Sequence, residues 1–294
     1  MMIVDAHTHG YPEEVLKDPR SFALVQKEAH WQELVCPKNK KTLQGWSTRE
    51  EMVADMDNAE VDRAVLLGWY WENPETCALQ NEWSRQWISQ DPNRFIGFVS
   101  LHPDTQNPIE SLRKSKDLGF MGIGECHPWL QGASIQNDNW MNCMQFASDH
   151  DWPVTFHVTE PVGHDYPGRV QTPFEEFLWL ARQLPELKII LAHAGGLFPF
   201  YELNPKIRPE LRNVYYDLAA CPLLYDPSIY RKLIETVGLA KILWGTDYPL
   251  KIFPATQKVP DFKSFKNLIL KEARLTELER NAIFGNNFLS LLPC

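Results

Sequence analysis

The sequence lacks the signatures of several large protein classes. Its six cysteines form no CxxC pair and no dense framework, which argues against a disulfide scaffold or a cysteine-rich zinc site and is typical of a reducing compartment. No apolar stretch approaches the length of a membrane span, and the N-terminus has no basic segment followed by an apolar run. We therefore expect a cytoplasmic protein that does not contact a membrane.

An excess of positive charge is also absent. The chain has 29 Lys and Arg residues against 38 Asp and Glu residues, a formal net charge of −9. Such a chain has no general attraction for nucleic acid. The expected partner is a small-molecule substrate rather than nucleic acid, and the sequence leaves formation of a homo-oligomer open.

Short apolar runs alternate with amphipathic stretches of helical length along the whole chain. The runs predict eight strands, at 3–5, 64–68, 95–101, 121–125, 154–157, 189–193, 214–217 and 242–245. The stretches between and after them predict helices at 49–59, 74–90, 108–118, 140–150, 173–184, 227–237, 261–273 and 276–289. The last of these begins with Thr276 and Glu279 in a capping-box pattern.

This alternation predicts the α/β class and a single-domain (β/α)8 barrel of the TIM type over residues 1–294. An open doubly wound sheet is the alternative, but no GxGxxG follows the first strand and the chain has no P-loop. Residues 11–47 exceed an ordinary loop between a strand and a helix and contain Phe22, Trp31 and Trp46. We predict that they form an inserted loop or lid over the barrel mouth.

Histidines and carboxylates stand where several predicted strands end. They are His7 and His9 in VDAHTHG, Glu125 in GIGEC, His157 in FHVTE, His193 in LAHAGG and Asp247 in GTDYP. A single histidine after an apolar run is more often a hydrogen-bonded structural residue. Because barrel enzymes gather their active-site groups at the carboxyl ends of the strands, the joint pattern favours a metal site with these six residues as ligands.

Imidazole nitrogen and carboxylate oxygen suit Zn²⁺, which is the expected ion, with Mn²⁺, Fe²⁺ and Ni²⁺ as alternatives. A divalent ion with an open position lowers the pKa of bound water to about 7. Asp247 is predicted to accept the proton and pass it to the leaving group, and His193 is the second predicted catalytic residue. The competing interpretation of Asp247 is an Asx turn with Tyr248 and Pro249.

The ordered set DAHTH, FHVTE, LAHAGG and GTDYP resembles the signature of the amidohydrolase superfamily. The last two forms resemble especially the amidohydrolase-related branch that contains the aminocarboxymuconate-semialdehyde decarboxylase-like enzymes. The resemblance spans the chain from the first strand to the last. It implies a distorted (β/α)8 barrel with a mononuclear or binuclear metal centre, and chemistry that is hydrolytic or, in some members, a non-oxidative decarboxylation.

Glu125 departs from the simplest pattern of that branch. Binuclear relatives place a bridging ligand at this strand, either a carboxylated lysine or, as in TatD-like enzymes, a glutamate. The resemblance therefore allows one or two ions. With two ions, Glu125 would bridge them, with His7, His9 and Asp247 on one ion and His157 and His193 on the other. The alternative is that Glu125 orients a ligand imidazole without contacting the metal.

Aromatic and basic residues follow other strand ends and are predicted to bind substrate: Trp69, Trp71, His127, Trp129, Arg169 and Lys251. The rings suit a planar or cyclic substrate, and either basic group could hold a carboxylate. Core packing and solvated surface are the competing interpretations.

The main functional hypothesis is a metal-dependent hydrolase that uses a metal-activated water to cleave a small cyclic or carboxylated substrate, such as a lactone, amide or ester. The first alternative is a metal-dependent non-oxidative decarboxylase of a small aromatic or unsaturated acid. GIGE alone suggests a TatD-like nuclease, against which the acidic net charge argues. A non-catalytic binding protein that keeps the barrel is the remaining alternative.

Overall fold

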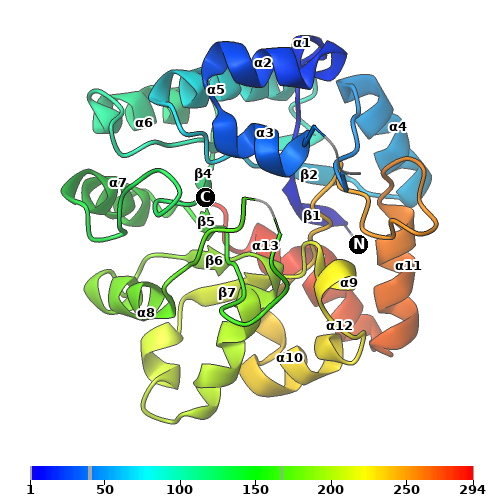
Figure 1. The fold of residues 1–294 in the computed structure, drawn as a ribbon. Helices are drawn as coiled ribbons and strands as arrows, with labels where there is room; N and C mark the ends of the chain where they lie inside the picture. Colours follow the sequence, from blue (N-terminus) through cyan, green and yellow to red (C-terminus); the bar gives the residue numbers. More distant parts are fainter. Residues whose placement is uncertain (1, 39–41, 167, 294) are drawn as a thin grey trace.

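Eight parallel strands follow one another around a barrel in the computed structural model, which describes residues 2–38, 42–166 and 168–293 (Figure 1). The strands are β1 (Val4–Thr8), β2 (Arg63–Leu66), β3 (Phe95–Val99), β4 (Gly122–Cys126), β5 (Val154–Phe156), β6 (Ile189–Leu191), β7 (Val214–Asp217) and β8 (Ile242–Leu243). Neighbours in the chain pair with each other from β1 to β8. The predicted TIM-like (β/α)8 barrel is therefore confirmed.

Backbone hydrogen bonds between the β1 segment and the residues just after β8 close the barrel. The Ala6 N–H donates to the Trp244 carbonyl over 2.9 Å, and the Asp247 N–H donates to the His7 carbonyl over 2.9 Å. One step further along, the His9 N–H donates to the Tyr248 carbonyl over 2.7 Å. These bonds join the β1 segment to the segment after β8, so that residues after β8 lie beside His7 and His9.

Helices cover the outside of the barrel (Figure 1). They are α4 (Arg49–Ala59), α5 (Pro74–Gln90), α6 (Pro108–Asp117), α7 (Asp138–Asp149), α8 (Phe174–Gln183), α9 (Cys221–Leu224), α10 (Ile229–Val237), α11 (Lys263–Glu272), α12 (Glu277–Asn281) and α13 (Asn287–Leu289). Helices α4 and α5 coincide with the predicted ranges 49–59 and 74–90. None of the helices in the described ranges combines the length and hydropathy needed to span a membrane.

The single helix predicted over 276–289 is interrupted in the structure. The capping box of Thr276 and Glu279 is present at its start, but a π-helical turn at Ala282–Asn286 separates α12 from α13. A Cβ atom on Gly285 would lie 2.0 Å from the Met2 carbonyl oxygen. Only glycine permits this close approach of two backbones, and the contact brings the C-terminal segment against the start of β1.

A small apolar cluster fills the barrel interior. It joins side chains of β1, β2, β3, β6 and β8 to Phe288 and Leu291 near the C-terminus. Because Phe98 on β3 and Ile190 on β6 are not on neighbouring strands, their common cluster must lie inside the barrel rather than between the sheet and the helices. A larger cluster packs the outer faces of the strands against the helices.

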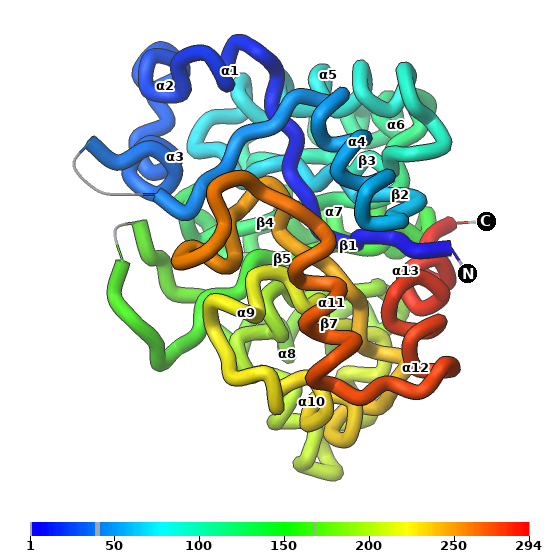
Figure 2. Tube along the Cα trace, turned by 90° about the vertical axis from the view of Figure 1, so that its right-hand side faces the viewer, coloured from blue at the N-terminus to red at the C-terminus, as the bar shows by residue number. Residues whose placement is uncertain are grey.

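The predicted insert 11–47 is helical over much of its described part. It contains α1 (Glu13–Lys17), α2 (Pro19–Gln26) and α3 (Ala29–Val35), whereas residues 39–41 lie outside the described residues. Figure 2 shows α3 and the loop between β5 and α8 at one end of the molecule and both chain termini at the other. The insert thus lies at the carboxyl ends of the strands, and its action as a lid stays a prediction.

Buried polar contacts fasten this insert to neighbouring loops. The Glu28 carboxylate accepts the backbone N–H groups of Glu72, over 2.7 Å, and Asn73, over 3.2 Å. In return, the Glu72 carboxylate accepts the His30 N–H over 2.7 Å. The His30 ring also lies 2.5 Å from the Gly168 carbonyl oxygen. The insert is therefore bound both to the loop after β2 and to the loop after β5.

Candidate metal centre

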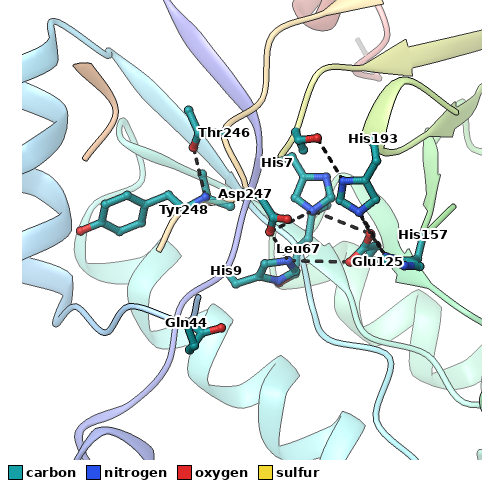
Figure 3. Close-up of polar contacts among 12 residues, drawn as sticks. His7, His9, Gln44, Leu67, Glu125, His157, His193, Thr246, Asp247 and Tyr248 are labelled. Carbon is teal, nitrogen blue, oxygen red and sulfur yellow. Dashed lines mark hydrogen bonds and ion pairs between the residues drawn. The ribbon is translucent and has the colours of Figure 1, made fainter. Parts of the chain in front are cut away.

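Six side chains with metal-ligating atoms meet at the barrel mouth (Figure 3). The first three form what we call the β1–β8 group: His7, His9 and Asp247. The Asp247 Oδ1 atom lies 3.4 Å from His9 Nε2 and 3.7 Å from His7 Nε2. Atoms bonded to one ion at about 2.0–2.2 Å in a tetrahedral arrangement lie roughly 3.3–3.6 Å apart. The β1–β8 group therefore fits the first coordination sphere of a divalent ion.

The other three side chains form the β4–β6 group: Glu125, His157 and His193. The Glu125 Oε1 atom lies 3.1 Å from His157 Nδ1 and 3.5 Å from His193 Nε2, and the two imidazole nitrogens are 3.2 Å apart. Glu125 also connects the two groups, since its Oε2 atom lies 3.7 Å from His9 Nε2. One carboxylate thus faces both candidate metal positions.

Hydrogen bonds behind the rings decide which nitrogen each histidine presents. The His7 Nδ1–H donates to Asp217 Oδ2 over 3.0 Å, and the His193 Nδ1–H donates to the Ala219 carbonyl over 3.1 Å. The His9 Nδ1–H donates to the Leu67 carbonyl over 3.3 Å. Each of these rings consequently turns its Nε2 toward the cluster, which is how second-sphere acceptors orient metal-binding imidazoles.

Two of these nitrogens have unmet bonding capacity. The Nε2 atoms of His7 and His9 are buried and have no hydrogen-bond partner among the described residues. Burying a polar nitrogen without a partner costs about 1–3 kcal/mol. A divalent ion in the β1–β8 group would satisfy both atoms at once, so the donor set fits the metal that the sequence predicts.

The charges of the cluster are strongly coupled. Burial opposes ionisation of Glu125, but the His7 and His157 imidazoles outweigh it and hold the pKa of Glu125 well below its usual range. Burial likewise opposes ionisation of Asp247, whereas the neighbouring His9 and His7 imidazoles lower the pKa of Asp247 to about 2. Both carboxylates are therefore ionised near neutral pH.

The pKa values of the cluster's imidazoles are shifted in opposite directions. Burial favours neutral rings, yet the Asp217 and Glu125 carboxylates raise the pKa of His7 to about 10, and Glu125 raises the pKa of His193 to about 9. For His157 burial prevails and lowers the pKa. Without an ion, protons on His7 and His193 balance the carboxylates, and a divalent ion would take their place.

An unusual backbone positions His193. The five residues His193–Leu197 all have positive φ angles, between 54° and 74°. Gly195 and Gly196 adopt this left-handed conformation without a steric penalty, and a Cβ atom on Gly195 would lie 2.9 Å from a Tyr216 ring carbon. The turn sends the chain away from β6 immediately after His193, which leaves the imidazole at the barrel mouth.

Asp217 is a site residue that the sequence interpretation missed. It ends β7, completely buried, and its position after an apolar run carries the same signal as His157 and His193. Its Oδ2 atom accepts from His7, and its Oδ1 atom accepts from the backbone N–H groups of His193 and Ala219, each over 3.0 Å. A single carboxylate therefore positions residues of both groups.

Replacing Asp217 with Asn tests this positioning role. The amide would turn an N–H₂ donor toward His7 Nδ1, which favours the tautomer with a proton on the metal-facing Nε2. We expect metal affinity to fall by about 10- to 100-fold, the usual effect of losing such a partner. Competition with a chromogenic chelator measures the affinity, and an unchanged affinity in a folded variant would contradict the role.

Several predicted substrate-binding residues surround the cluster. The Trp69 ring centre lies 5.4 Å from that of His9 and 4.5 Å from that of Tyr70. The His127 ring stacks on His157 with centres 5.1 Å apart, and Trp129 contacts His127 edge-on at 5.7 Å. These aromatic rings line the side of the cluster nearest β2 and β4.

The remaining predicted substrate-binding residues lie further from the ligand atoms. Trp71 is fully buried and packs against Trp31 with ring centres 5.3 Å apart. The Arg169 Nη2–H donates to the Glu160 carbonyl over 2.5 Å, in the loop after β5. Lys251 follows β8, and its backbone N–H donates to the Leu43 carbonyl over 2.8 Å. Their contact with substrate stays a prediction.

A barrel with imidazole and carboxylate ligands at the carboxyl ends of its strands defines a candidate metal-dependent enzyme. Residues 4–293 match the sequence profile of the amidohydrolase family. The chain therefore belongs to the amidohydrolase family, as the motifs predicted, and is an enzyme of that superfamily.

Two characterised relatives align with about four-fifths of the chain. The 2-amino-3-carboxymuconate-6-semialdehyde decarboxylase of Dictyostelium discoideum is 27% identical over 271 residues, which cover 81% of this chain and 73% of the relative. The 4-sulfomuconolactone hydrolase of Hydrogenophaga intermedia is 21% identical over 258 residues, which cover 81% and 77%. The relatives thus include one decarboxylase and one hydrolase.

Solved structures share the fold at low sequence identity. The 5-carboxyvanillate decarboxylase of Sphingomonas paucimobilis has a TM-score of 0.73 and 14% identity, covering 99% of this chain and 98% of that one. The dihydroxybenzoic acid decarboxylase of Polaromonas sp. JS666, with bound manganese and the inhibitor 2-nitroresorcinol, has a TM-score of 0.69 and 18% identity, covering 99% and 96%. At these identities the comparison shows a shared fold and nothing further.

Proposed function

We propose that the protein is a metal-dependent non-oxidative decarboxylase of a small aromatic or unsaturated carboxylic acid. The observation that carries this proposal is the alignment of four-fifths of the chain with a muconate-semialdehyde decarboxylase. The ligand cluster at the barrel mouth supports it, because these side chains would hold the metal that such a reaction uses. This proposal places decarboxylation before hydrolysis, whereas the sequence motifs favoured a hydrolase.

In the proposed reaction, the bond between the substrate carbon and its carboxylate breaks, and the electron pair stays on that carbon. Carbon dioxide leaves, and one proton must reach the carbon. His7, His9 and Asp247 would hold the ion, which when bound supplies a Lewis acid for a substrate oxygen. We propose Zn²⁺ or Mn²⁺, of which the latter is bound in the dihydroxybenzoic acid decarboxylase.

His193 and Asp247 are the proposed acid–base residues. The His193 Nδ1–H is held by the Ala219 carbonyl, so that its Nε2 faces the cluster and can carry a second proton. A positioned acid of this kind contributes about 10²- to 10⁴-fold to the rate of proton transfer reactions. Glu125 holds the His157 and His193 rings in place through its Oε1 atom.

Release of carbon dioxide tests the proposal. Protein loaded with Zn²⁺ or Mn²⁺ is incubated with hydroxybenzoates, carboxyvanillates and carboxymuconate derivatives, with chelator-treated protein as the control. We expect carbon dioxide release from at least one acid and its loss after metal removal. Ring opening of lactones without carbon dioxide release would contradict decarboxylation, and so would metal-independent release.

Hydrolysis is the second candidate, and the position of Glu125 favours it. Glu125 lies between the β1–β8 and β4–β6 groups, where a bridging carboxylate would hold two ions about 3.5–4 Å apart. The relation to a sulfomuconolactone hydrolase points the same way. In this arrangement His157 and His193 would be ligands of the second ion.

The metal content of a Glu125→Gln variant separates the two candidates. For a decarboxylase we expect one ion per chain in the wild type, retained in the variant with an affinity about 10- to 100-fold lower, because Glu125 then acts only by orienting imidazoles. Elemental analysis of the purified proteins measures the content. A fall from two ions to one would instead assign Glu125 to the bridge and support the hydrolase.

A further inference from the structure

A cluster of three polar side chains holds the far end of the segment that begins at His193. The Glu202 carboxylate, 1% exposed, accepts the Tyr216 hydroxyl over 2.7 Å. The Lys241 ammonium donates to both oxygens of the same carboxylate, over 2.9 and 2.8 Å, and to the Leu211 carbonyl over 2.8 Å. Removing one member of such a pair is costly, because the other charge stays buried. The cluster is therefore a fixed point of the fold.

Tyr216 and Asp217 are successive residues of β7 that hold the two ends of one segment. The segment is η1 (His193–Leu203). Asp217 accepts the backbone N–H of its first residue, His193, over 3.0 Å. Tyr216 donates to Glu202, its last residue but one. The strand thus fixes where η1 begins and where it ends.

The left-handed turn lies between these two ends. Ala194 and Leu197 have φ angles of 54° and 74° without being glycine, which is an unfavourable backbone for both. Such a backbone persists only where the surrounding structure holds it in place. The Tyr216 ring lies directly against the turn, since a Cβ atom on Gly195 would be 2.9 Å from one of its carbons. Contacts with β7 therefore support the turn.

We propose that Glu202 is a positioning residue for His193 and acts together with Tyr216 and Lys241. Because the far end of η1 is fixed to β7 and to the residue before β8, the turn cannot relax. The His193 Nε2 atom then stays 3.2 Å from His157 Nδ1, within the candidate metal centre. This inference rests on the proposed function for the proton transfer that His193 would carry out.

The principal test removes one oxygen atom from the cluster. Tyr216→Phe keeps both the ring that lies against Gly195 and the ion pair, so we expect the variant to fold. Glu202→Gln is a second variant that removes the charge of the carboxylate. Lys266→Met is the matched control for general destabilisation. Lys266 is 7% exposed, and its ammonium donates to the Ala59 carbonyl, which joins α11 to α4 and involves no residue of η1 or β7.

We expect Tyr216→Phe to lower kcat for decarboxylation about 10- to 100-fold, the effect of a small displacement of a reacting group. KM should stay within a factor of about two of the wild type. In metal-loaded protein without substrate, deuterium exchange of the peptide that contains residues 193–197 should become about tenfold faster, because the turn has lost one hydrogen bond of its support. Glu202→Gln should show the same changes. Lys266→Met should lower the melting temperature and leave both kcat and this exchange rate like the wild type.

Three results would overturn the positioning role: a folded Tyr216→Phe variant with the kcat of the wild type, equal exchange over 193–197 in that variant and the wild type, or equal losses of kcat in Tyr216→Phe and Lys266→Met. The proposed reaction is judged separately, by carbon dioxide release from the wild type. If no acid is decarboxylated, the proposed function fails, and the exchange rates alone decide the positioning role.

Discussion

Replacement of Asp247 with Asn is expected to lower turnover by about 10²- to 10⁴-fold. The carboxylate is an ionised group directed at His7 and His9, and an amide can neither accept a proton nor neutralise a divalent ion to the same degree. Asn is the appropriate replacement because Asp247 has a φ of 68°, a left-handed conformation that Asn tolerates well. Steady-state kinetics on the identified substrate measure the effect.

Metal content and thermal stability of the same variant provide the control. The Asp247 backbone N–H donates to the His7 carbonyl and its carbonyl accepts from Leu250, and both bonds survive the change. We therefore expect Asp247→Asn to fold like the wild type. Turnover within a factor of about three of the wild type at equal metal loading would exclude Asp247 from the chemistry.

Metal-stripped protein is expected to lose stability as the pH rises from about 6.5 to 9. The folded protein holds protons on His7 and His193 with pKa values of about 10 and about 9, whereas both unfolded imidazoles release theirs near 6.5. This stabilisation is complete below pH 6.5 and declines as the pH rises toward the folded values. The loss should be on the order of a few kcal/mol.

Addition of the metal should change this pH dependence. An ion replaces the protons on the imidazoles, and its affinity rises with pH because the ligands must be deprotonated. The difference in melting temperature between metal-loaded and stripped protein should therefore widen from pH 6.5 to 9. Thermal unfolding at fixed ionic strength measures both curves, and parallel curves would show that His7 and His193 do not exchange protons for metal.

The barrel and the ligand cluster could be predicted from the sequence because both depend on local patterns. Apolar runs marked each strand, and the residue at the end of a strand marked the barrel mouth. For this reason Glu125 and His157, which are far apart in the chain, could be assigned to one site before any contact was known. The same rule also pointed to Asp217, which was overlooked because a lone aspartate after VYY carries no recognised motif.

Other features depend on long-range contacts that no local pattern reveals. The π-helical turn near the C-terminus contains Gly285, which packs closely against the Met2 backbone. The helical insert is attached to the barrel through Glu28, whose partners Glu72 and Asn73 follow β2.

The location of metal in the folded protein tests the central claim most directly. Crystals of Mn²⁺-loaded protein can be measured at a wavelength where manganese scatters anomalously. The account predicts a peak within coordination distance of His7 Nε2, His9 Nε2 and Asp247 Oδ1. A well-ordered, fully loaded crystal with no peak among these atoms, or with manganese bound only elsewhere on the chain, would contradict it.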